Sequence, residues 1–108
     1  MDPIEINAGA WYLRALRADE RIDDRPSLAD LGETDPDYVS RRTAQWADES
    51  GYSWAVCEPT TGELLAEVIV DPASATLSTR ARPGHEHVVE VAATAVRRFA
   101  AAALNLTV

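Results

Sequence analysis

Four stretches of the chain carry apolar patterns that predict β-strands. Large apolar residues alternate with other residues from Trp11 to Leu16 and again from Tyr52 to Glu58. The stretch from Leu64 to Val70 is apolar on both faces apart from Glu67, a pattern typical of a strand in the middle of a sheet. The segment from Ala75 to Arg80 is short, and we predict that it forms the next antiparallel strand.

Two helices are predicted from apolar residues that recur every three or four positions. Val39, Thr43 and Trp46 lie on one face of the first helix. The second predicted helix runs from Gly84 to Leu104, and Asn105–Val108 looks like the beginning of a further strand. The apolar stripe of the second helix consists of Val88, Ala92, Ala95, Phe99 and Ala103.

Proline and glycine mark where these elements begin and end. Asp35-Pro36 is a helix start, with an acceptor side chain at the N-cap and proline at the first helical position. Gly51 is expected to close that helix in the left-handed conformation. Pro59-Thr60-Thr61-Gly62 is a turn between two strands, and Asp71-Pro72 ends the second of them.

The segment from Arg17 to Thr34 is strongly acidic and is predicted to be largely a loop. Leu28 and Leu31 are spaced to anchor one helical turn within it. Asp23 and Asp24 could attract a cationic amine, or they could belong to a loop that is simply solvated.

Together these elements predict an α+β domain that spans residues 1–108. We expect an antiparallel sheet of three to five strands packed against two main helices. A chain of 108 residues is long enough for one hydrophobic core.

Charge and composition narrow the possible partners. The formal net charge is -8, which argues against a duplex nucleic-acid partner because its phosphates would be repelled. All ten basic residues are arginine. The single cysteine, Cys57, lies in an apolar run and is expected to be a buried small hydrophobe rather than a reactive thiol. The sequence has neither a signal peptide nor a membrane-spanning stretch, so a cytoplasmic protein is the expectation.

The clearest hint of a ligand lies where the last strand meets the long helix. A glycine turn at a helix N-terminus is a place where backbone N–H groups can hold a phosphate, and Gly84 lies there with Arg80 and Arg82 just before it. The alternative is an ordinary strand end with two solvated arginines. His85 and His87 are two residues apart and do not face the same way on a helix, so we predict no metal site.

Taken in order, these segments resemble the GNAT N-acetyltransferase superfamily, particularly its branch of ribosomal-protein-alanine-like acetyltransferases. The resemblance rests on the following segments: the apolar-Leu-Arg-like strand Trp11–Asp19, Arg41–Trp46, Tyr52–Val56, Thr61–Val68, and Arg80–Gly84 leading into Ala92–Leu106. It covers most of the chain. It implies binding of acetyl-CoA as co-substrate and direct transfer of the acetyl group to a primary amine.

The resemblance also implies roles for particular residues. Arg80, Arg82 and Gly84 are the candidates for holding the pyrophosphate, and Glu67 is the candidate catalytic base. Glu67 could instead pair with an arginine on a sheet face.

The chain departs from the family pattern in three ways. Its turn keeps only one glycine, and it carries Pro83, which lacks an N–H, and Glu86, which adds negative charge. The predicted strand Ala75–Thr79 holds no carboxylate. The sequence ends at Val108, before the later strands of a full-length member.

Three function classes remain open. The first is an acetyl-CoA-dependent N-acetyltransferase-like protein. The second is a non-catalytic remnant of that fold that serves dimerisation or partner binding, and a homodimer is expected because the missing strands would leave an edge uncovered. The third is an acidic protein that occupies a basic partner.

Overall fold

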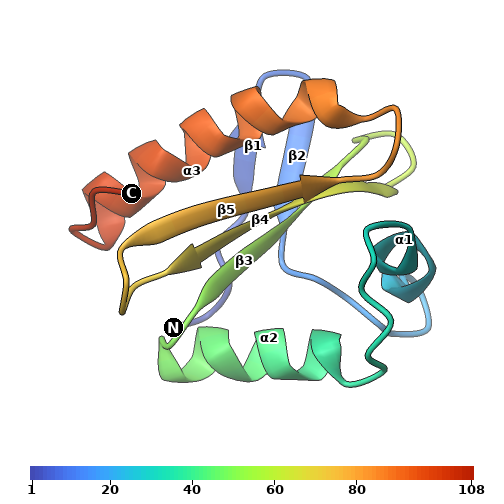
Figure 1. Cartoon of the computed structure of the whole chain (residues 1–108), viewed down its shortest axis with the longest axis horizontal. Coiled ribbons are helices and arrows are strands. Elements are labelled where there is room, and N and C mark those ends of the chain that lie inside the picture. The colour runs from blue at the N-terminus through green and yellow to red at the C-terminus, as the bar shows by residue number, and fades with distance from the viewer.

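The computed structural model describes all 108 residues, and its centre is one antiparallel sheet (Figure 1). Each strand pairs with its neighbours along the chain, so the spatial order is the sequence order, β1-β2-β3-β4-β5. The strands are β1 (Ile6–Ala8), β2 (Trp11–Arg14), β3 (Tyr52–Cys57), β4 (Leu64–Asp71) and β5 (Thr76–Ala81). This arrangement confirms the α+β prediction and the central position of Leu64–Val70.

Helices cover both faces of the sheet (Figure 1). Helix α3 (Val89–Ala103) lies across one face, after a short 3-10 turn η1 (Glu86–Val88). Helices α1 (Arg25–Asp30) and α2 (Tyr38–Asp48) lie on the other face. None of the three helices combines the length and apolar composition needed to cross a bilayer.

The core forms on both faces of β3, all six residues of which are buried. Trp54 is fully buried, and its ring makes edge-to-face contacts with Phe99 of α3 at 5.6 Å and Trp46 of α2 at 5.1 Å. The Trp46 indole N–H donates to the Ser53 carbonyl at 3.1 Å, next to the part of β3 that the short β2 does not reach. The aromatic residues therefore join both helix layers to the sheet.

Several predicted boundaries were wrong at the ends of the elements. The strand predicted over Trp11–Leu16 ends at Arg14, and Asn105–Val108 forms no strand. The segment Arg17–Thr34 contains α1, which forms around the buried Leu28 as the predicted helical turn suggested. Strand β1 was not predicted at all, because three residues with one polar member carry too little alternation to detect.

The caps of α2 also differ from the prediction. The helix begins at Tyr38, and Asp35 accepts a hydrogen bond from the Asp37 N–H at 2.9 Å without capping the helix itself. The left-handed residue at the other end is Glu49, with φ of 63°, rather than Gly51. The helix predicted over Gly84–Leu104 likewise begins later, as η1 at Glu86.

A buried ion pair fastens the acidic segment to the sheet. Arg14 and Asp24 are 4% and 2% exposed, and two hydrogen bonds of 2.8 Å join the guanidinium to the carboxylate. The same guanidinium donates to the Gly62 carbonyl at 2.9 Å, and the Arg17 N–H donates to Asp24 at 2.7 Å. Asp24 is therefore a structural residue and not part of a solvated loop.

Strand β5 pairs with β4 on one side only, so its outer edge has no strand partner. It is six residues long, and it contains neither proline nor glycine. Such an edge is open to pairing with another chain. The homodimer expected from the sequence stays a prediction.

Removing one partner of the buried pair should destabilise the fold strongly. We expect Asp24→Asn to lower the free energy of unfolding by about 3–5 kcal/mol, because Arg14 is then left as an uncompensated buried charge. Urea unfolding followed by circular dichroism measures this loss. The matched control is Asp23→Asn, which removes an exposed carboxylate paired with Arg25 and should leave the midpoint almost unchanged. Equal midpoints for the two variants would contradict the structural role of Asp24.

Candidate functional site

The backbone of the turn between β5 and α3 is accessible at Gly84. Gly84 has a φ of 86°, and a Cβ atom there would meet nothing within 4 Å. The His85 N–H donates to the Arg82 carbonyl at 2.9 Å, which closes the turn. The Gly84 N–H points toward Glu86 Oε1 at 3.4 Å, a long contact from an exposed carboxylate. The glycine therefore serves the left-handed turn that the sequence suggested.

Two backbone N–H groups at the start of the α3 segment are free. Those of Glu86 and His87 donate to no acceptor in the structure. Unsatisfied N–H groups at a helix N-terminus carry partial positive charge and suit an anion. The Glu86 carboxylate lies beside the same turn and competes with an anionic ligand there.

The Arg82 guanidinium is held away from these N–H groups by carboxylates of other segments. It donates to Asp30 of α1 at 3.1 Å and to Glu63 of the β3–β4 turn at 2.5 Å. It also donates to the Leu64 carbonyl at 3.2 Å. Binding of a diphosphate by Arg82 would therefore require it to leave these partners.

Arg80 and Glu67 face each other across β4 and β5, where they are paired in register. The Arg80 Nε donates to Glu67 Oε1 at 2.7 Å, and its Nη2 donates to Glu33 at 3.1 Å. Glu67 is fully buried. The arginine pairing that the sequence left open for Glu67 is thus present, while its role as a base and the phosphate role of Arg80 stay predictions.

Tyr38 completes the surroundings of Glu67, and sequence reasoning missed it. Its hydroxyl donates to Glu67 Oε2 at 2.7 Å and accepts from the Arg42 Nε at 3.0 Å. Burial and the hydrogen bond to Glu67 raise the pKa of the Tyr38 phenol above its ordinary value. The Arg42 and Arg80 guanidiniums lie 5.0 and 5.3 Å from the centre of the tyrosine ring. The only sequence signal was the i, i+4 spacing of Tyr38 and Arg42.

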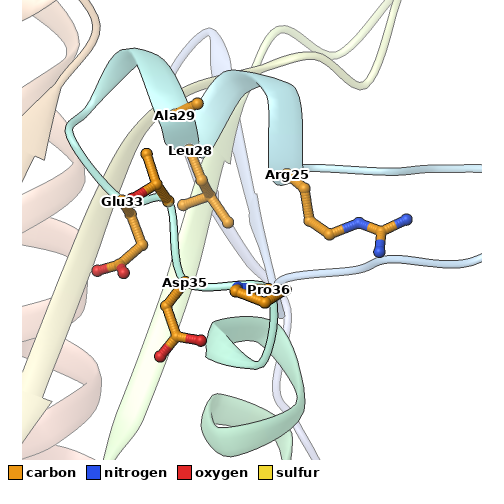
Figure 2. A pocket seen from close by; sticks show the side chains of 7 residues that line it. Arg25, Leu28, Ala29, Glu33, Asp35 and Pro36 are labelled. Carbon is orange, nitrogen blue, oxygen red and sulfur yellow. The ribbon is translucent and has the colours of Figure 1, made fainter.

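A pocket of about 260 Å³ opens between α1 and the loop that leads to α2 (Figure 2). Leu28 and Ala29 supply apolar surface, and Glu33 and Asp35 supply carboxylates. Each carboxylate already pairs with an arginine, Glu33 with Arg80 and Asp35 with Arg41. The pocket belongs to the same network as Glu67, through Arg80.

The two histidines contribute packing near α3. The His87 ring lies edge-on to the Trp11 ring at 5.8 Å, and the His85 and His87 ring centres are 6.1 Å apart. No three side chains of the types that bind metals are grouped closely enough to hold an ion. Cys57 is buried, and burial raises the pKa of its thiol to about 12, so the thiol is neutral at physiological pH.

Comparison with known proteins places this geometry in a known fold. No protein-family model and no curated protein matches the sequence. A solved structure from Vibrio cholerae, provisionally described as a ribosomal-protein-serine acetyltransferase, superimposes with a TM-score of 0.76. The match covers 98% of this chain and 72% of that chain. This chain therefore shares the fold of that structure. At 17% identity the likeness concerns the fold alone, and it confirms the fold that the sequence resemblance implied.

Tyr38→Phe should reveal how far Glu67 depends on the phenol. We expect the free energy of unfolding to fall by about 1–3 kcal/mol at neutral pH, because a buried carboxylate oxygen of Glu67 loses its hydrogen-bond donor. A raised folded-state pKa means that the phenol stabilises the fold fully below its unfolded value of 10.0 and loses this effect as the pH rises further. The stability gap between wild type and variant should therefore narrow above pH 10. Urea unfolding across a pH series measures it, and a gap that stays constant would contradict the network.

Proposed function

We propose that this chain is an acetyl-CoA-dependent N-acetyltransferase-like protein whose acceptor is a primary amine. The observation that carries the proposal is the succession of β5, a left-handed glycine turn and α3 within an acetyltransferase fold. The acetyl donor would be bound at this turn. The amine nitrogen would attack the thioester carbonyl and lose a proton, and the coenzyme would leave as a thiol.

The residues at the turn supply backbone donors for the diphosphate of the donor substrate. The unpaired N–H groups of Glu86 and His87 are the best suited, and the open space at Gly84 allows a close approach. Arg82 follows β5 directly and would add charge if it exchanged Asp30 and Glu63 for the diphosphate. Arg80 is more firmly held, because its partner Glu67 is fully buried.

Acetyl-CoA should bind to the purified chain. We expect isothermal titration calorimetry to detect binding in the micromolar to millimolar range, and Arg82→Ala to weaken it about fivefold to tenfold. Glu86→Gln should strengthen binding, because it removes a competing negative charge beside the free N–H groups. The matched control is Arg97→Ala, which removes an exposed arginine from α3. An absence of binding in both wild type and Glu86→Gln would rule out the coenzyme site.

A second candidate is a non-catalytic module that keeps the fold for partner binding or dimerisation. One observation favours it. Both Glu67 oxygens already accept hydrogen bonds, from Arg80 and Tyr38, and the side chain has no exposed surface. A general base must reach the proton that it removes, so Glu67 would first have to give up one of these partners.

Transfer assays distinguish the two candidates. If Glu67 is the base, Glu67→Gln should slow acetylation of a peptide with a free α-amine by about 100-fold or more while acetyl-CoA binding persists. Product mass and thiol release measure the reaction. The control Glu33→Gln removes the other carboxylate that pairs with Arg80 and should retain most of the activity. Coenzyme binding by wild type without any transfer would favour the non-catalytic module.

A further inference from the structure

Among the arginines that are not exposed, one has no carboxylate partner. Four of them form ion pairs, namely Arg14, Arg17, Arg80 and Arg82, as do the exposed Arg25 and Arg41. Half-buried Arg42 forms none, although the chain carries 18 acidic residues. A half-buried guanidinium without a carboxylate partner from its own chain is unusual in so acidic a protein.

Neutral contacts hold the Arg42 guanidinium in one orientation. Its Nε donates to the Tyr38 hydroxyl at 3.0 Å, and its Nη1 donates to Gln45 Oε1 at 2.8 Å. The group lies 5.0 Å from the centre of the Tyr38 ring. The remaining nitrogen, Nη2, donates to no acceptor in the structure. Arg42 is therefore preorganised, with one edge of its fork unused.

This side chain lines a pocket of about 280 Å³ between α2 and the strands β4 and β5. We call it the α2–β5 pocket. Ile69 contributes apolar surface, and Gln45 and Ser78 contribute polar groups that can donate hydrogen bonds. The Gln45 oxygen accepts from Arg42, so its amide nitrogen is left as a donor. Asp71 also lines the pocket, and its carboxylate accepts from the Ala73 N–H at 3.0 Å in its own turn.

We propose that the α2–β5 pocket binds a small carboxylic acid, with the carboxylate on Arg42 and the rest of the molecule against Ile69. The oriented guanidinium of Arg42 has a free nitrogen, and it lies in the same pocket as the Gln45 amide and the Ser78 hydroxyl. These donors can bind the two acceptor oxygens of a carboxylate. The pocket holds one unpaired positive charge and one aspartate, so a monoanion suits it better than a doubly charged phosphate. The volume exceeds what a bare ion requires, and within a mostly polar lining Ile69 offers an apolar contact to the carbon atoms of an organic acid.

This site is separate from the proposed coenzyme turn. It lies on the α2 face of the sheet, and Ser78 precedes Arg80 by two positions on β5. Arg42 nevertheless reaches Glu67 through Tyr38, which bonds to both. Because the pocket and the turn are formed by different residues, ligand binding in the pocket can be tested whether or not acetyl-CoA binds.

The test is a titration of the isotope-labelled chain followed by nuclear magnetic resonance. N-acetylglycine, which has a carboxylate and no amine, should cause saturable shifts at Gln45, Ile69 and Ser78. The neutral N-acetylglycinamide should not, and inorganic phosphate should bind more weakly at the same residues. Equal responses to the acid and its amide, or tighter binding of phosphate, would overturn the proposal.

Matched variants assign the effect to the pocket. Ser78→Asp places a negative charge beside Arg42 and should abolish binding, whereas the neutral Ser78→Asn should largely retain it. Ser78 is exposed, so neither change threatens the fold. Arg42→Lys keeps the charge and loses the fork, and we expect about tenfold weaker binding, while Arg41→Lys should have little effect. N-acetylglycine binding that survives Ser78→Asp unchanged would place the ligand elsewhere.

Discussion

The fold depends on how a carboxylate is accommodated in the middle of its sheet. Glu67 lies on β4, between β3 and β5, and its side chain faces α2 with no exposed surface. Burying an unpaired carboxylate costs several kcal/mol, so the charge is tolerated only with partners that also come from the protein. Arg80 supplies the opposite charge from β5, and Tyr38 supplies a donor from α2. The start of α2 and the register of the last hairpin are therefore tied to the same buried group.

That constraint bears directly on anion recognition at the β5–α3 turn. Arg80 pairs with Glu67 and Glu33, and Arg82 pairs with Asp30 and Glu63, so both arginines are engaged on the α1–α2 side of the sheet. The turn itself offers the free backbone N–H groups of Glu86 and His87. Recognition of a diphosphate would accordingly rest first on N–H groups and the helix dipole, which need no side-chain charge, and only then on Arg82.

The sequence was most informative where burial on two faces dictated the pattern. Strands β3 and β4 could be predicted because their apolar residues leave no polar face, and α3 because its stripe is long. Helix caps were harder, since Asp35 bonds within its own turn and Glu49, not a glycine, takes the left-handed conformation. The sequence left open an arginine partner for Glu67, but Tyr38 could not be predicted, because it is 29 residues away and only the tertiary fold brings it close.

Arg42 differs from the other arginines that are not exposed, because it has no carboxylate partner. Acidic residues outnumber arginines by 18 to 10, so a half-buried arginine would be expected to find a carboxylate within its own chain. Glu67 is already satisfied by Arg80 and Tyr38, and Asp71, which lines the same pocket as Arg42, accepts from the Ala73 N–H in its own turn. Tyr38 presents Arg42 with a neutral acceptor and a ring face, which fix the guanidinium without cancelling its charge. The contacts of Glu67 thus leave Arg42 oriented but without a carboxylate of its own. For this reason the α2–β5 pocket, rather than any arginine at the β5–α3 turn, is where a side chain is already set to receive an anion.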